Sequence, residues 1–304
     1  MPKQKKEINM LLGAHISIAG GLEKSIERGE NLNINCMQIF TKSNRQWKAK
    51  NLSKDEVLIF KKKWQQSFIN TIVVHASYLI NLGSPQKKIV MQSVNALTLE
   101  LERCEQLGIS SLIIHPGSSQ KMPEKQCLKQ VADLIDLVLS KVPGKSAIIL
   151  ENMAGQGSSI CYQFEQLAFI LKEIKEKKRV GVCFDTCHAF AAGYDFKTKK
   201  QYDHMWEKFD KIIGLKNLNI IHLNDSKKSL GSRVDRHEFI GKGDLTIEAF
   251  SLLMNDKRFT NIPKILETPI NTEADYQKDF KVLIKTLSPQ HRSWIKKTPL
   301  KAYI

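Results

Sequence analysis

The stretch VGVCFDTCHAF, residues 180–190, runs from a nearly continuous apolar segment into a carboxylate, which is followed three residues later by a histidine. Short, β-rich apolar runs are typical of parallel strands that are covered on both faces. This run predicts a strand over 180–186, with His188 about one helical turn beyond the strand end. Seven further runs of the same form predict strands at residues 11–17, 36–41, 71–76, 111–115, 147–151, 218–224 and 264–268.

The segments between these runs carry helix signals. Ser53 and Glu56 form a capping box, and Ser84 followed by Pro85 predicts the start of a long helix that ends at Gly108. Eight alternating units of this kind predict an α/β protein, a (β/α)8 TIM barrel. The alternative is an open doubly wound sheet, which normally has a Gly-rich phosphate loop after an early strand, and the sequence shows none.

Length and composition bound the organisation of the chain. Its 304 residues suit one barrel domain over 1–304, with a short basic extension at about 1–9 and a basic tail at about 288–304 that we expect to be solvated. The six cysteines form no CxxC pair, and no apolar run has the length of a membrane span. We expect a cytoplasmic protein with reduced thiols, no membrane association and no organic cofactor. The net charge of +16 favours nucleic acid as a partner, although lysines that only solvate the surface would give the same value.

Residues able to bind metal lie at or just after the ends of six predicted strands. They are His75, His115, Glu151, Asp185, His222 and Glu267. A single such histidine is more often a hydrogen-bonded core residue, and a single carboxylate often caps the next helix. Six of them are much harder to explain in this way, because the carboxyl ends of barrel strands face one rim. We therefore expect these side chains to meet in one pocket.

Three more candidates join this set. His188 follows Asp185 by one helical turn, and Asp235 and His237 are two residues apart, so an extended backbone points both the same way. Nine candidate ligands, five histidines and four carboxylates, exceed what one ion needs and predict several ions. Imidazole-rich sets favour zinc, with manganese, iron or cobalt also open. Cys183 and Cys187 are interpreted as packing residues.

Several segments together resemble the endonuclease IV family. They are HASYLINLGS, HPGS, ENMAGQGS, CFDTCHAFAAGYD, HLNDSK, GSRVDRH and LETP, in the order of that family and spread over about residues 13–268. The resemblance implies three Zn²⁺ ions per chain. One is held by His75, His115 and Glu151, the second by Glu151, Asp185, His222 and Glu267, and the third by His188, Asp235 and His237. It also implies a catalytic role for Glu151, Asp185 and Glu267.

The turn TKSNRQW after the second predicted strand exposes Asn44, Arg45 and Gln46, while Tyr78 and Leu79 closely follow His75. The resemblance implies that Arg45, Tyr78 and Leu79 enter duplex DNA and fill the gap left by an extruded nucleotide, with Asn44 and Gln46 as further DNA contacts. Trp47 and Leu79 packing beneath a loop is the other interpretation.

The activity that the resemblance implies is hydrolysis of the phosphodiester 5′ to an abasic site in duplex DNA. It would leave a 3′-hydroxyl and a 5′-deoxyribose phosphate, with 3′ end cleaning as a second activity and a monomer as the expected state. Two alternatives stay open: a sugar isomerase or epimerase on the same barrel, which needs fewer metal ligands, and a lesion-binding protein that no longer cuts.

Overall fold

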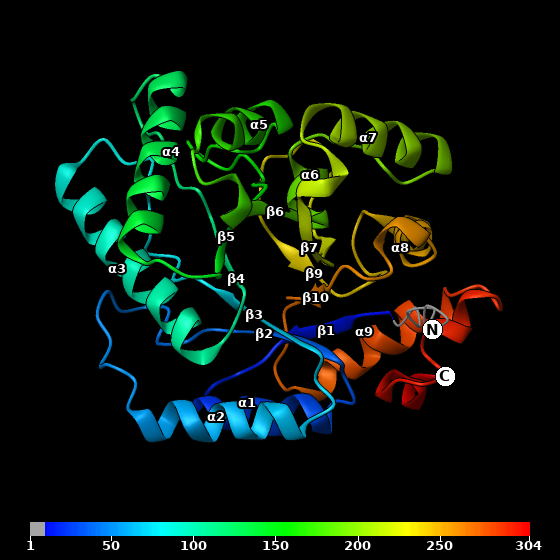
Figure 1. Ribbon diagram of the computed structural model, residues 1–304. Coiled ribbons are helices and arrows are strands. Elements are labelled where there is room, and N and C mark those ends of the chain that lie inside the picture. Colours follow the sequence, from blue (N-terminus) through cyan, green and yellow to red (C-terminus); the bar gives the residue numbers. More distant parts are fainter. Residues whose placement is uncertain (1–9) are drawn as a thin grey trace, which may run out of the picture.

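Eight parallel strands form one closed barrel in the computed structural model, which describes residues 10–304 (Figure 1). The predicted TIM barrel is confirmed. The strand order around it is β1-β10-β7-β6-β5-β4-β3-β2. The strands are β1 Leu12–His15, β2 Cys36–Ile39, β3 Thr71–His75, β4 Ser111–Ile114, β5 Ala147–Glu151, β6 Val180–Asp185, β7 Leu218–His222 and β10 Lys264–Leu266. Each lies inside one of the predicted runs.

Helices surround the strands on all sides of the barrel (Figure 1). They are α1 Leu22–Asn31, α2 Lys54–Gln66, α3 Lys87–Leu107, α4 Glu124–Lys141, α5 Phe164–Glu173, α6 Thr186–Ala191, α7 Lys199–Ile212, α8 Thr246–Met254 and α9 Ala274–Lys285. The capping box of Ser53 and Glu56 is present, and Gly108 ends α3 in the left-handed conformation with φ 76°. The start of α3 is later than predicted, because the Ser84 hydroxyl accepts a hydrogen bond from the Gln86 N–H and forms a turn before the helix.

The barrel interior is filled in layers. The lower layer is an apolar cluster of Cys36, Val73, Ile113, Ile149, Cys183, Ile220 and Ile265, one residue from each of seven strands. Side chains two residues apart on a strand point the same way. The residue two positions after each of these therefore also faces inward, one layer nearer the carboxyl ends, and this second layer is where the candidate ligands lie.

A short excursion interrupts the barrel between β7 and α8. It contains the antiparallel pair β8 Asp225–Ser226 and β9 His237–Glu238. The buried carboxylate of Asp225 accepts hydrogen bonds from four backbone N–H groups, those of Ser226, Gly241, Gly243 and Leu245. These bonds tie the excursion to the barrel rim.

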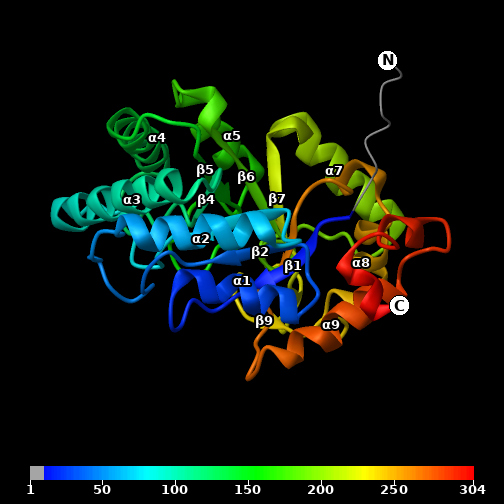
Figure 2. The same ribbon diagram turned by 60° about the horizontal axis from the view of Figure 1, so that its bottom comes forward.

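The C-terminal tail packs against the barrel, so the expectation of a solvated tail is wrong. Trp294, Leu300 and Tyr303 are buried, and the Tyr303 hydroxyl donates a hydrogen bond to the Leu32 carbonyl. The tail is helical in part and its last turn lies beside α9 (Figure 2). Five 3-10 turns complete the structure: η1 Lys177–Arg179, η2 Leu215–Asn217, η3 Lys257–Phe259, η4 His291–Trp294 and η5 Pro299–Tyr303. The predicted basic extension at 1–9 lies outside the described residues.

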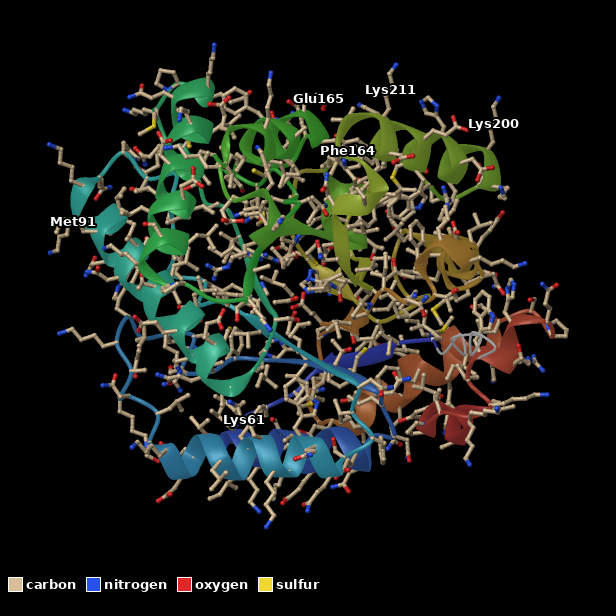
Figure 3. The ribbon with its side chains drawn as sticks, viewed as in Figure 1. Lys61, Met91, Phe164, Glu165, Lys200 and Lys211 are labelled. Carbon is tan, nitrogen blue, oxygen red and sulfur yellow. The ribbon has the colours of Figure 1, made fainter. Side chains whose placement is uncertain are left out.

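The outer surface carries many of the cationic side chains. Lys61 on α2, and Lys200 and Lys211 on α7, project outward from the helix ring (Figure 3). Part of the net charge therefore solvates surfaces away from the rim. All six cysteines are buried and have free thiols. In the described part of the chain, no helix combines the length and apolar character needed to cross a membrane.

Candidate metal centre

The second inward layer of the barrel is polar on every strand. It contains His15, Gln38, His75, His115, Glu151, Asp185, His222 and Glu267, at or just after the strand ends. The six residues singled out at predicted strand ends all belong to this layer. The structure therefore brings together residues that are spread over most of the chain, because parallel strands all end at the same rim.

Glu151 lies at the centre of the cluster and is fully buried. Its Oε2 atom is 3.3 Å from the Nε2 atoms of both His75 and His115. Its Oε1 atom is 3.1 Å from Nδ1 of His222 and 3.2 Å from Nδ1 of His188. Each oxygen thus faces a different pair of imidazoles, an arrangement suited to a carboxylate that bridges two ions.

A second set of donor atoms surrounds His222. Its Nδ1 atom is 3.2 Å from Glu267 Oε2 and 3.8 Å from Asp185 Oδ2. The amide of Asn224 donates hydrogen bonds to the same two oxygens, at 2.6 Å to Asp185 and 3.4 Å to Glu267. Asn224 therefore fixes the direction of both carboxylates, a contribution that the strand-end pattern did not predict.

The third set comes from outside the barrel strands. Asp185 caps α6 by accepting the His188 N–H at 2.7 Å, and this contact turns His188 into the pocket. Asp235 Oδ2 is 3.2 Å from His188 Nε2, and Asp235 Oδ1 is 3.4 Å from His237 Nε2. The Gln156 side chain accepts a hydrogen bond from the Asp235 N–H at 2.9 Å and holds this loop in place.

Donor atoms close enough to share an ion form several groups. They are His75, His115 and Glu151; Glu151, Asp185, His222 and Glu267; Asp185, His188 and His237; and Cys187, Asp235 and His237. The first two groups have the composition that the resemblance implies. In the third region the structure adds Asp185 and Cys187 beside the expected histidines and Asp235.

The histidines are oriented like ligands. His75 Nδ1 lies 2.7 Å from the Ala76 carbonyl and His237 Nδ1 lies 3.1 Å from the Glu267 carbonyl, which leaves Nε2 of both rings facing the cluster. Nε2 of His188 and of His237 are buried and make no well-aligned hydrogen bond among residues 10–304, although both lie within 3.4 Å of the Asp235 carboxylate. Buried polar atoms without a partner are rare and costly. Together with the converging carboxylates, these two atoms fit divalent cations.

The charges in the cluster also favour the binding of divalent cations. Burial opposes ionisation of Glu151, but His222 and His115 outweigh it, so that its pKa is well below the ordinary value. Burial likewise opposes charge on His188 and His222, yet nearby acids hold their pKa values well above the ordinary one. Glu151 is thus kept ionised by neighbouring positive charge, and a bound cation would supply that charge in place of protons.

Two cysteines near the cluster, Cys183 and Cys187, are buried and free. Burial raises the pKa of Cys183 and of Cys187 to about 12. The thiolate is the form that binds metal. Imidazoles and carboxylates therefore make up most of the donor set, and the Cys187 thiol lies beside Asp235 and His237.

The residues expected to contact DNA lie on two rim loops. Asn44, Arg45 and Gln46 follow β2, and the side chains of Arg45 and Gln46 are exposed. Tyr78 follows β3, is 55% exposed, and its ring centroid is 5.2 Å from that of His75. Leu79 is half-buried. The loops thus border the cluster, with Tyr78 directly beside it.

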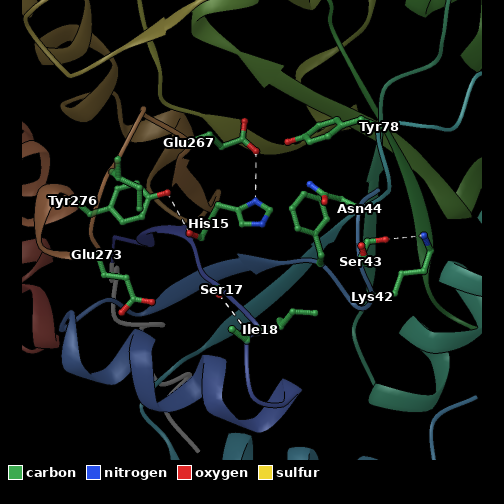
Figure 4. Close-up of a pocket in the computed structure, with 13 residues that line it drawn as sticks. His15, Ser17, Ile18, Lys42, Ser43, Asn44, Tyr78, Glu267, Glu273 and Tyr276 are labelled. Carbon is green, nitrogen blue, oxygen red and sulfur yellow. Dashed lines mark hydrogen bonds and ion pairs between the residues drawn. The ribbon is translucent and has the colours of Figure 1, made fainter. Parts of the chain in front are cut away.

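A cavity of about 640 Å³ opens between these loops and the cluster (Figure 4). Its walls include His15, Asn44, Tyr78 and Glu267, and Tyr276 closes another side. One wall therefore consists of a candidate ligand, and the opposite wall consists of the rim loop with Asn44. A substrate in this cavity would touch both.

Comparison with known proteins agrees with this geometry. The model of the xylose isomerase-like TIM barrel family matches residues 26–286. A protein of Geotalea daltonii named probable endonuclease 4 is 46% identical over 267 residues, which cover 87% of this chain and 94% of that protein. Endonuclease IV from Thermus thermophilus has a TM-score of 0.80 at 31% identity, covering 95% of this chain and all of that one. A D-tagatose 3-epimerase-like protein, at 21% identity and a TM-score of 0.71, covers 91% of this chain and 97% of its own, and shows the fold alone.

Fold and site together define a xylose isomerase-like TIM barrel whose rim gathers histidines and carboxylates that could hold divalent ions. The enzyme class is that of metal-dependent phosphodiester hydrolases. Within this superfamily, the chain belongs to the endonuclease IV family, as its sequence motifs indicated.

Proposed function

We propose that this protein hydrolyses the phosphodiester 5′ to an abasic site in duplex DNA, leaving a 3′-hydroxyl and a 5′-deoxyribose phosphate. The observation that carries the proposal is the convergence of nine imidazole and carboxylate side chains, with Glu151 at their centre and two exposed loops at their border. A sugar isomerase would not need the third set of donors, and a protein that only binds DNA would need none of them.

Three zinc ions fit the donors best. His75, His115 and Glu151 would hold the first, and Glu151, Asp185, His222 and Glu267 the second. His188, Asp235 and His237 would hold the third, with Asp185 close enough to contribute. When bound, the ions supply Lewis-acid stabilisation of the phosphoryl oxygens and an activated water as nucleophile.

The protein's own residues would position the reactants. Glu151 and Glu267 face the centre from the ends of β5 and β10, and Asn224 holds the oxygens of Glu267 and Asp185 in fixed directions. Four carboxylates among three divalent ions leave a site charge of about +2, which attracts a phosphodiester. In-line displacement at phosphorus would release the 3′ oxygen of the preceding nucleotide, and the same geometry would remove blocking groups from 3′ ends.

Recognition would depend on the two loops. Tyr78 and Leu79 would enter the duplex beside the lesion, and Arg45 would contact it from the other loop together with Asn44 and Gln46. Extruding an abasic nucleotide costs little because it has no base to unstack or unpair. The cavity beside His15 and Glu267 has the size of a small ligand site and would receive it.

The test uses a duplex oligonucleotide with one tetrahydrofuran abasic analogue, which cannot undergo β-elimination, so any cut must be hydrolytic. Zinc-loaded wild type should cut on the 5′ side and leave a 3′-hydroxyl that a polymerase extends. Glu267→Gln should lose at least about a thousandfold in rate, because several kcal/mol of stabilisation depends on the ligand set. Glu248→Gln, on the exposed side of α8, is the matched control and should cut like wild type.

Each other outcome points to an alternative. Binding of the abasic duplex by zinc-loaded wild type without any cut would favour a lesion-binding protein. Neither binding nor cutting would reject the nuclease proposal, and conversion of a ketose or aldose by the same protein would then favour the isomerase.

A further inference from the structure

Gln38 on β2 lies inside the barrel between three residues of the site. Its side chain is fully buried. Its Nε2 atom is 2.5 Å from Glu267 Oε1 and 2.8 Å from His15 Nδ1, and its Oε1 atom is 2.9 Å from His222 Nε2. One amide thus makes all of its contacts with residues of the cluster and its cavity.

The neighbouring carboxylate fixes which way this amide points. Glu267 can only accept hydrogen bonds, so the NH₂ group of Gln38 must face it. The second N–H of that group then donates to His15 Nδ1, which has to be unprotonated. On the other side, the carbonyl of Gln38 can only accept, so His222 must carry its proton on Nε2.

We propose that Gln38 is the positioning residue that holds His222 and His15 in the Nε2–H tautomer, one for metal binding and the other for substrate contact. With its proton on Nε2, His222 presents the lone pair of Nδ1 toward Glu151 at 3.1 Å and Glu267 at 3.2 Å. That is the atom that lies among the donors of the second candidate ion. A histidine ligand commonly needs a partner of this kind on its other nitrogen.

In His15 the two ring nitrogens exchange roles: Nδ1 contacts Gln38, and Nε2 is left for the substrate. Its ring lines the cavity and packs at a tilt of 52° against Phe40, with ring centroids 4.3 Å apart. The His15 carbonyl accepts a hydrogen bond from the Tyr276 hydroxyl at 3.2 Å (Figure 4). Among the described residues, Nε2 of His15 makes no hydrogen bond. Held by Gln38, it is a fixed N–H donor for an oxygen of the bound substrate, and under the proposed function that oxygen belongs to a phosphate or a deoxyribose.

Histidine-selective ¹⁵N labelling tests the tautomers directly, without any substrate. The chain has eight histidines, and His15→Gln and His222→Asn assign the two relevant signals. In the zinc-loaded wild type, both rings should give the Nε2–H pattern, with Nδ1 of His222 shifted by metal. In Gln38→Met, the His15 signal should become a mixture of tautomers. Gln166→Met is the matched control, because Gln166 is also a buried amide but bonds to Glu124, and it should leave both signals unchanged.

Zinc release and kinetics separate the two roles. Gln38→Met should lose zinc to a chelator about ten- to a hundredfold faster, as removal of such partners does elsewhere. His15→Gln should keep wild-type zinc retention and raise KM or lower kcat only for the abasic duplex. If Gln38→Met folds poorly, Gln38→Ala provides the same measurements with a smaller side chain.

A wild-type spectrum with His15 protonated on Nδ1, or wild-type zinc release from both Gln38 variants, would overturn the proposal. Because the spectra and zinc release are measured without DNA, a failure of the proposed nuclease activity would not alter them. The two conclusions can therefore fail separately.

Discussion

Exchanging Glu100 for glutamine should destabilise the protein by about 3 kcal/mol, near the lower end of the cost of leaving one buried charge unpaired. Glu100 lies on α3, and its Oε1 atom is 3.3 Å from Lys42 Nζ, with 1% and 3% of the two side chains exposed. Lys42 also donates to the carbonyls of Gln46 at 2.6 Å and Ser43 at 3.2 Å. Glu100 accepts the N–H of Ser77 at 3.2 Å. This one ion pair therefore holds both loops proposed to contact DNA.

The contacts of Glu100 and Lys42 decide how large the loss of unfolding free energy is in Glu100→Gln. Removal of one partner from a buried pair costs about 3–5 kcal/mol. In Glu100→Gln the new amide oxygen can still accept from Ser77, and Lys42 keeps its two carbonyl acceptors, so the lower value is expected. The double variant Lys42→Met/Glu100→Gln buries no unpaired charge. It should be less destabilised than the sum of the single variants by about 2 kcal/mol.

The assay is equilibrium unfolding in urea of the four zinc-loaded proteins, with a double-mutant cycle computed from their free energies of unfolding. Asp133→Asn is the matched control, since the Lys129–Asp133 pair on α4 is about half exposed and should contribute about 1 kcal/mol or less. Cleavage kinetics of the abasic duplex should show a raised KM with nearly unchanged kcat, because the loops move while the metal ligands do not. Additivity of the two single variants within about 0.5 kcal/mol, or a cost no larger than that of Asp133→Asn, would refute the reasoning.

Three further predictions concern the barrel and its rim. Burial lowers the pKa of Lys264 to about 8 from its ordinary 10.5, so the unfolded chain binds more protons than the folded chain between these pH values. The free energy of unfolding should therefore rise by about 3 kcal/mol relative to Lys264→Met between about pH 7.5 and 10.5, measured in paired melts. A difference between the two proteins that does not change with pH would show that burying the charged lysine costs nothing. A Cβ on Gly13 would lie 1.6 Å from the Cys36 carbonyl oxygen, so Gly13→Ala should cost at least about 3 kcal/mol in urea unfolding, and a near-neutral result would disprove the tight β1–β2 approach. Removal of zinc by a chelator should lower the melting temperature, since each ion at a thousandfold excess over its Kd stabilises the fold by about 4 kcal/mol; an unchanged melt would argue against a metal centre.

Most of the barrel could be predicted because each strand repeats one rule. Residues such as Ile149 and Ile220 point inward, and the polar residue two positions later, Glu151 or His222, points inward one layer higher. An apolar run that ends in a histidine or acid therefore locates both a strand and a candidate ligand. The apolar runs located all eight strands, and the histidine or acid at the end of six of them located the strand-end residues of the cluster.

The same rule would have found Gln38, two residues after Cys36, but an amide inside a strand has no chemistry that marks it in a sequence. Glu100 and Lys42 were also invisible, because a glutamate on a helix and a lysine in a loop normally face solvent. The tail was misjudged for a related reason. Its lysines dominate the composition, whereas its buried Trp294 and Tyr303 depend on a surface that only the folded barrel provides.

The position of the ligands explains how one barrel architecture can support different chemistries. The strand ends supply His75, His115, Glu151, Asp185, His222 and Glu267, so a single barrel layer provides two of the candidate metal sites. The additional donors come from outside that layer: His188 from α6, and Asp235 and His237 from the excursion between β7 and α8. The excursion keeps its shape through Asp225, whose burial raises its pKa even though four backbone N–H groups stabilise the charged form. A buried carboxylate of this kind contributes to stability only while the loop that surrounds it stays folded. The region that supplies the third set of donors is therefore held by local hydrogen bonds rather than by the barrel core.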